Sequence, residues 1–148
     1  MAALNPKPRW SSERGAELIE MVIALPLLLL LMFGIVDFGF MFQRYVVLTN
    51  AAMEGARVGI LPGYGINDAK LRAEAYATTG GIPAGEAIAD PQMVTLDEPG
   101  GGTWPAIEVT VRHPYTYQFA GPFASMFGGS LGTVTLTARS TMRRQLGS

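Results

Sequence analysis

The strongest constraint on this chain is a long apolar run near its N-terminus. Residues 21–42 include a single charged side chain, Asp37, and most of the others are Leu, Ile, Val, Met or Phe. A helix of this length spans roughly 33 Å, close to the ~30 Å hydrocarbon core of a bilayer. The sequence therefore predicts one transmembrane helix at about residues 21–42. A cleavable secretory signal is the alternative, although its apolar region would be only about 7 to 15 residues long.

The basic residues that flank the run favour one orientation in the membrane. Lys7, Arg9 and Arg14 precede it, whereas only Arg44 and Arg57 follow at short range. Because cytoplasmic flanks carry the excess of Lys and Arg, we expect the N-terminus to be cytoplasmic and the rest of the chain to lie outside.

The helical pattern continues beyond the apolar run. Residues 43–60 contain no proline, and small or apolar residues recur there at three- and four-residue spacing. We expect one helix over residues 16–60, its C-terminal part amphipathic, which ends before Pro62 and Gly63. Pro26 is expected to kink this helix because proline lacks the backbone N–H donor.

Three small residues in the extension, Ala51, Gly55 and Gly59, are spaced four apart. This spacing lets two backbones approach closely. The stripe can pack against the chain's own sheet or against the helix of a second subunit. We favour packing within the chain, because these residues lie outside the predicted bilayer.

After residue 62 the sequence changes to short elements typical of a small head. Good helix formers at residues 69–78 predict a short helix, capped by Asn67 or Asp68. Alternating β-branched residues then predict an antiparallel sheet of about three strands. The predicted strands are residues 92–96, 106–111 and 133–138. The expected fold class is α+β and pilin-like, with a long N-terminal helix, a short helix and this sheet.

An aromatic segment lies between the last two predicted strands. Tyr115, Tyr117 and Phe119 alternate along it, and Phe123 and Phe127 follow. This segment can complete the small core of the head. A partly exposed set of aromatic residues would instead form a contact surface for a partner or for the membrane interface.

The composition offers little material for catalysis or for nucleic-acid binding. The formal net charge is −1, without the basic excess of a nucleic-acid binder. The chain has no cysteine and a single histidine, His113, which precedes a proline and is expected at the surface. We therefore predict that the protein is not an enzyme and holds no metal or cofactor.

Three other charged residues have expected positions. Asp37 lies near the outer end of the apolar run, where its carboxylate is expected to reach water; a contact with another subunit or an assembly factor is the alternative. Glu54 and Arg57 are three residues apart, which allows an ion pair on the helix surface. We favour instead a role of the stretch LTNAAMEGAR in fixing how the head packs on the stem.

Glu20 stands at the entrance of the apolar run, where a carboxylate that enters hydrocarbon costs about 2.5 to 3.5 kcal/mol. Cleavage between Gly15 and Ala16 would create a cationic α-amino group able to neutralise Glu20 of the same or an adjacent chain. The alternative places Glu20 in the headgroup region without a special role.

These residues resemble a known family. Gly15 followed by Ala16-Glu17-Leu18-Ile19-Glu20 resembles the processing site of type IV pilin-like proteins. The stretches RGAELIEMVIALPLLLLLMFGIVDFG and YVVLTNAAMEGAR are similar to the TadE-like family of the tight-adherence (Tad/Flp) pilus systems. The resemblance covers about residues 14–60 and is weaker over residues 61–148.

The resemblance implies a minor pilin or pseudopilin in the inner membrane that helps to build an adhesive pilus. A prepilin peptidase would cleave after Gly15, Ala16 would become the N-terminus, and Glu20 would pair with an N-terminal amine during assembly. The implied regions are a leader (1–15), the N-terminal helix (16–60) and an extracytoplasmic head (61–148). The implied partners are other pilin subunits through the N-terminal helix, the peptidase, the assembly machinery and the membrane. An uncleaved single-pass scaffold of the same apparatus is the alternative.

Overall fold

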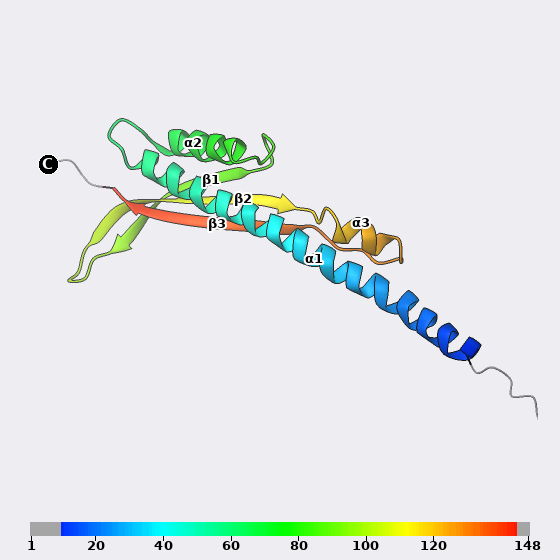
Figure 1. The fold of residues 1–148 in the computed structure, drawn as a ribbon. Coiled ribbons are helices and arrows are strands. Elements are labelled where there is room, and N and C mark those ends of the chain that lie inside the picture. The colour runs from blue at the N-terminus through cyan, green and yellow to red at the C-terminus, as the bar shows by residue number, and fades with distance from the viewer. Residues whose placement is uncertain (1–9, 145–148) are drawn as a thin grey trace, which may run out of the picture.

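A computed structural model describes residues 10–144, with side chains from residue 15 onward. A long N-terminal helix is followed by a short helix, a three-stranded antiparallel sheet and a further short helix before the last strand (Figure 1). The elements are α1 (Trp10–Gly59), α2 (Ile66–Thr79), β1 (Ile88–Asp97), β2 (Thr103–Tyr115), α3 (Ala120–Ser125) and β3 (Val134–Arg143). The predicted α+β fold class is confirmed.

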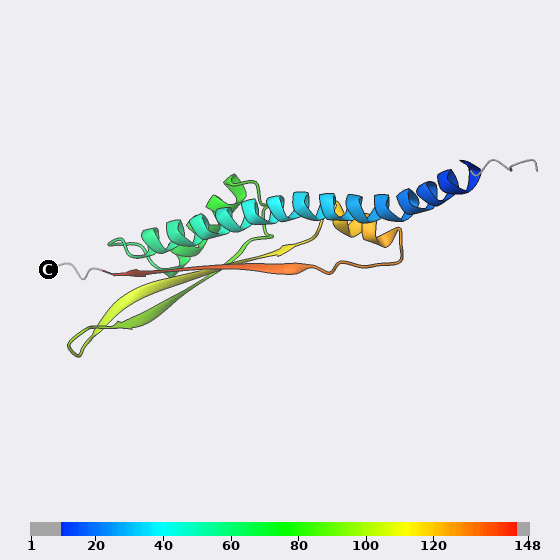
Figure 2. The same ribbon diagram turned by 60° about the horizontal axis from the view of Figure 1, so that its bottom comes forward.

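Helix α1 has 50 residues and extends well beyond the rest of the molecule. Its C-terminal half lies along the sheet, whereas its N-terminal part projects away from the head (Figures 1 and 2). Pro26 lies within the helix, and Figure 2 shows that α1 bends in its blue N-terminal part. The helix ends at Gly59, and Gly63 then takes a positive φ of 85° in the turn toward α2.

The sheet has the strand order β1-β2-β3, with β2 in the centre. Ile107 of β2 faces Met93 of β1 and Met142 of β3 in the antiparallel register. The turn between β1 and β2 is closed by the N–H of Glu98, which donates to the carbonyl of Gly102 at 2.9 Å. All three predicted strands are present, and each is longer than predicted.

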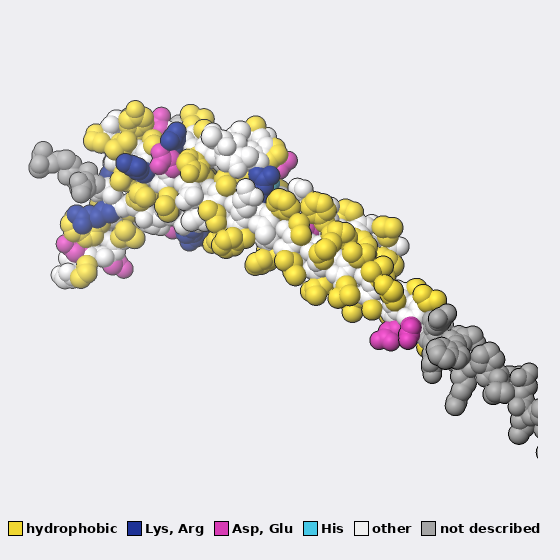
Figure 3. Space-filling model, in the orientation of Figure 1, with side chains coloured by type: hydrophobic (Ala, Val, Ile, Leu, Met, Phe, Trp, Pro, Cys, Tyr) yellow, Lys and Arg dark blue, Asp and Glu magenta, His cyan; other side chains and the backbone are white. Residues whose placement is uncertain are grey.

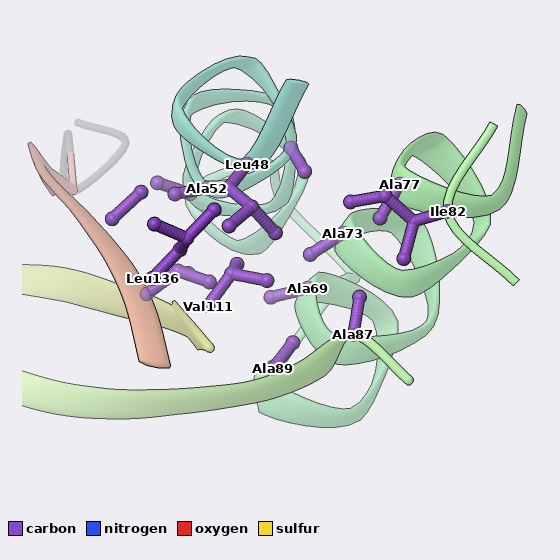
Figure 4. Packing of buried hydrophobic residues seen from close by; sticks show 14 of the residues in the cluster. Leu48, Ala52, Ala69, Ala73, Ala77, Ile82, Ala87, Ala89, Val111 and Leu136 are labelled. Atoms are coloured by element: carbon purple, nitrogen blue, oxygen red, sulfur yellow. The ribbon is translucent and has the colours of Figure 1, made fainter. Parts of the chain in front are cut away.

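The core lies between α1, α2 and the sheet. Leu48 and Ala52 of α1 point toward Val111 of β2 and Leu136 of β3, and the alanines of α2 lie beside them (Figure 4). Much of this core is alanine, so the helices and the sheet can approach closely. The buried alanines are Ala51, Ala52, Ala56, Ala69, Ala73, Ala77, Ala87, Ala89 and Ala138.

Two glycines of α1 mark the closest of these approaches. A Cβ atom on Gly55 would lie 2.8 Å from the carbonyl oxygen of Ala69 and 2.8 Å from Cβ of Ala73. A Cβ atom on Gly59 would lie 2.8 Å from Cδ1 of Ile107. With Ala51 also fully buried, the small-residue stripe of this chain is covered by α2 and the sheet.

The start of α2 differs from the expectation. The helix begins at Ile66, so Gly65 is the residue before its first turn. The carboxylate of Asp68 accepts the backbone N–H of Gly65 at 2.9 Å. Asp68 therefore stabilises the helix start from inside the first turn, while Asn67 is not the cap.

The ion pair considered for Glu54 and Arg57 does not form, and the expectation for His113 was wrong. Glu54 pairs with Arg72 of α2, with Nη2 2.8 Å from Oε1, and Arg57 is exposed. His113 is only 4 % exposed, and its Nδ1 lies 3.3 Å from the carbonyl oxygen of Glu86. Both differences arise from tertiary contacts. Helix α2 packs beside α1 and brings Arg72 to Glu54. Strand β2 continues past residue 111, so His113 lies against the segment that precedes β1.

Candidate functional site: the stem and its junction with the head

The N-terminal part of α1 presents a continuous apolar surface. We call residues 21–42 the stem. Val22 and Ile23 are each 70 % exposed, and hydrophobic side chains cover the visible face of the stem (Figure 3). Such a large exposed apolar surface indicates a membrane or a protein interface, because monomeric soluble proteins rarely expose one. Within the described residues, α1 is the one helix long and apolar enough to cross a membrane, which fits a single-pass membrane anchor.

Charged residues set the limits of the stem. Glu20 is the last charged residue before the apolar run, and Arg44 is the first basic residue after it. Acidic side chains are visible at the N-terminal end of the stem in Figure 3. Arg44 is held at the other end, where its guanidinium donates to the carbonyl oxygen of Gly81.

The predicted processing residues lie in the exposed N-terminal part of α1. Gly15 and Ala16 are both helical, because α1 begins upstream at Trp10. Glu20 is exposed, and it has no hydrogen-bond or ion-pair partner among residues 15–144. Its carboxylate is one helical turn from Ala16, about 6 Å along the axis. Residues 1–9 of the predicted leader lie outside the described residues.

Asp37, in contrast, is fully buried. Its carboxylate accepts three backbone N–H groups at the start of α3. Oδ1 lies 2.9 Å from the nitrogen of Gln118, and Oδ2 lies 3.1 Å from that of Phe119 and 2.7 Å from that of Ala120. The expectation that this carboxylate reaches water was wrong, because the segment between β2 and α3 covers it.

This arrangement joins two parts of the chain that are far apart in sequence. The first N–H groups of a helix have no partner within the helix, and an acidic group there also interacts favourably with the helix dipole. Asp37 supplies that acceptor from α1. In return, the hydroxyl of Tyr115 donates to the carbonyl oxygen of Asp37 at 3.1 Å.

Aromatic contacts on either side of Asp37 strengthen the junction. The ring centroid of Phe33 lies 6.2 Å from that of Phe119 and 5.2 Å from that of Phe123. Phe40, on the other side, lies 6.1 Å from Phe119. Figures 1 and 2 both place α3 beside the middle of α1. We call residues 116–133 the α3 segment.

The aromatic segment that begins at Tyr115 contributes partly to the core of the head and partly to an exposed surface. Tyr115 is 3 % exposed and belongs to the core of the head. Met126 and Phe127 are 79 % and 66 % exposed. Its first residues therefore complete the core, whereas its later residues form a surface.

The environment of Tyr115 also affects its ionisation. Burial raises the pKa of Tyr115 above its ordinary value of 10.0, and the nearby Asp37 carboxylate raises this pKa further. The hydroxyl therefore remains a neutral donor to the Asp37 carbonyl at physiological pH.

The contact between Asp37 and α3 was not predicted from the sequence. One signal for a neighbouring apolar element was present, because no Asp, Glu, Lys or Arg occurs between Arg112 and Arg139. For metal chemistry, the described part of the chain has no group of three or more His, Cys, Asp or Glu residues that could hold an ion.

Comparison with known proteins gives a match to the long N-terminal helix and not to the head. No curated protein and no solved structure matches the chain. A family model described as TadE-like protein matches residues 15–57, which form α1 from Gly15 almost to its end. This match includes the stem, Asp37 and Gly55, and it confirms the resemblance seen in the sequence. Over residues 15–57 the chain is therefore similar to the TadE-like family of Tad pilus systems.

Proposed function

We propose that this chain is a minor pilin or pseudopilin that takes part in the assembly of a Tad/Flp-type pilus used for adhesion. The observation that carries the proposal is that the family match falls on the exposed apolar stem. A family of structural pilus components also agrees with a non-enzymatic role. The stem would anchor the subunit in the membrane before assembly and contact the stems of other pilin subunits afterwards.

The proposal includes processing by a prepilin peptidase after Gly15. Ala16 would then carry a free α-amino group one helical turn from Glu20. Because Glu20 is exposed, its carboxylate is accessible to the amine of a neighbouring subunit. Pairing would remove the cost of an isolated carboxylate in an apolar bundle.

The proposed location is the inner membrane, with the N-terminus in the cytoplasm and the head in the periplasm. Lys7, Arg9 and Arg14 before the stem support this orientation. The mature chain would then prime the pilus or enter it with the other subunits.

A second candidate function is an uncleaved single-pass scaffold of the same apparatus. One observation favours it: α1 begins at Trp10, so the helix continues without a break across the Gly15–Ala16 bond. A helical peptide bond must unwind before a peptidase can cleave it. An uncleaved chain would keep this helix intact.

The mature N-terminus distinguishes the two candidates. We would purify the chain from cells with and without the prepilin peptidase and determine its N-terminus by mass spectrometry. The pilin proposal predicts Ala16 in the presence of the peptidase and an intact leader in its absence. A Gly15→Val variant should retain the leader in both strains. An intact leader on the unmodified chain when the peptidase is present would favour the scaffold.

A further inference from the structure

The α3 segment lies beside the part of α1 that is inside the hydrocarbon core when the stem spans a membrane. Residues 21–43 separate Glu20 from Arg44 and span roughly 34 Å as a helix. A hydrocarbon core of ~30 Å takes up about 20 of these residues. Every placement that keeps both charged residues outside the core therefore puts residues 24–40 inside it.

The α3 segment contacts the stem within that range. Pro26, Leu27 and Leu30 line one cavity together with Phe123 and Phe127 of the α3 segment. Phe33 also lies against Phe123. The segment is therefore at the same level along α1 as stem residues that must be inside the membrane.

The composition of the α3 segment suits a lipid environment. It lies within the longest stretch of the sequence that lacks Asp, Glu, Lys and Arg, between Arg112 and Arg139. Its large apolar side chains point outward: Met126, Phe127 and Leu131 are 79 %, 66 % and 43 % exposed. Of these, Phe127 lies beside Pro26, Leu27 and Leu30 of the stem.

The backbone at both ends of α3 has hydrogen-bond partners within the protein. Such partners matter at membrane depth, where non-helical backbone is tolerated only if it is buried in protein or lines a water-filled cavity. Asp37 accepts the N–H groups of Gln118, Phe119 and Ala120. At the other end of α3, Gly128 donates to Ser125 at 3.1 Å and Gly129 to Ala124 at 3.0 Å.

We propose that the α3 segment inserts beside the stem into the membrane and reaches past the middle of the hydrocarbon core, where Met126, Phe127 and Leu131 contact lipid acyl chains. Asp37 makes this insertion possible because its carboxylate accepts the backbone N–H groups at the start of α3, which would otherwise have no hydrogen-bond partner inside the membrane. The inference rests on the proposed membrane anchoring of the stem. It adds a second membrane contact to a chain with a single spanning helix.

The absence of cysteine makes a depth measurement direct. We would attach a nitroxide spin label to single cysteines in the full chain, reconstituted in vesicles of phosphatidylethanolamine and phosphatidylglycerol. Collisions with oxygen report lipid exposure, and collisions with a water-soluble nickel chelate report water exposure. Phe127→Cys is compared with Leu71→Cys on α2, because Phe127 and Leu71 are 66 % and 67 % exposed, and with Leu31→Cys on the stem.

The proposal predicts that the label at Phe127→Cys resembles the one at Leu31→Cys. Both should collide with nickel several-fold less often than the label at Leu71→Cys, and both should remain accessible to oxygen. The additional change Asp37→Asn should raise the nickel accessibility at residue 127 and leave residue 31 unchanged.

Three results would overturn the proposal, and they are distinguishable. If residue 127 is as accessible to nickel as residue 71 while residue 31 is protected, the α3 segment lies in water although the stem is anchored. If residue 31 is also accessible to nickel, the membrane anchoring itself fails. If residue 127 is protected from both reagents, a second protein copy rather than lipid covers the segment.

Discussion

The carboxylate of Asp37 lies 2.7 Å from the backbone nitrogen of Ala120, a residue 83 positions later in the chain. This contact connects the apolar half of α1 with the connection between the last two strands of the head. Helix α3 therefore attaches the head to the stem, in addition to the packing of the head on the C-terminal half of α1.

Replacing Asp37 with Asn should weaken this connection. An amide offers one acceptor oxygen in place of two, so at least one N–H at the start of α3 loses its partner, at a cost of about 1–3 kcal/mol. We expect faster hydrogen exchange at residues 118–120 and a lower free energy of unfolding in detergent. Asp97→Asn, at an exposed position at the end of β1, is the matched control and should change neither quantity. Equal exchange in the two variants would contradict the role assigned to Asp37.

Replacing Gly55 with Val should destabilise the packing of α1 on α2. A Cβ atom there would lie 2.8 Å from a backbone oxygen and 2.8 Å from the Cβ of Ala73, so α2 has to move. Overpacking of this kind costs typically about 1–3 kcal/mol. Thermal unfolding followed by circular dichroism measures the effect. Gly39→Val is the control, because a Cβ on Gly39 meets nothing within 4 Å. Unchanged stability of Gly55→Val would show that α2 can move away from α1 at little cost in free energy, and would contradict this prediction.

Replacing Glu20 with Gln should impair pilus assembly without affecting membrane insertion or removal of the leader. The amide cannot form an ion pair with the α-amino group of a neighbouring subunit. Pili counted by electron microscopy, together with the mature mass of the membrane-bound chain, separate assembly from processing. Glu17→Gln, a nearby exposed carboxylate, should assemble normally. Normal pili in the Glu20→Gln variant would contradict the proposed ion pair between Glu20 and the α-amino group of a neighbouring subunit.

The ionisation of Tyr115 should occur later than that of exposed tyrosines. Burial and Asp37 both raise its pKa above 10.0. Its contribution to stability is therefore fully present below pH 10 and is lost as pH rises through the higher, folded-state pKa. A titration followed by tyrosinate absorbance should show a late phase that is absent in Tyr115→Phe and retained in Tyr64→Phe, since Tyr64 is 50 % exposed. Simultaneous ionisation of all tyrosines would contradict the burial of Tyr115.

The sequence predicted the elements that depend on local pattern. The apolar run and its extension predicted α1, helix formers predicted α2, and alternation predicted the three strands. In the predicted strand at residues 106–111, the alternating side chains of Ile107, Val109 and Val111 are all fully buried. Such features are readable because periodicity is a property of neighbouring residues.

The contacts that depend on tertiary structure were not predictable in the same way. The spacing of Glu54 and Arg57 allowed an ion pair on their own helix, yet Glu54 pairs with Arg72 of α2. Helix α3 has six residues, too few for a periodic signal, and Asp37 contributes to its start from across the molecule. A single sequence does not show which distant acidic residue satisfies a helix start.

On the proposed function, the contact between this protein and other pilin subunits is made by the exposed surface of the stem. It is tested most directly by a photo-crosslinking residue at Ile23, which is 70 % exposed, in cells that produce the complete pilus apparatus. We expect protein adducts in which mass spectrometry places the crosslink on the N-terminal helix of another pilin subunit, and no such adduct from Leu71 on α2. Protein adducts from Leu71 alone, with none from Ile23, would contradict it.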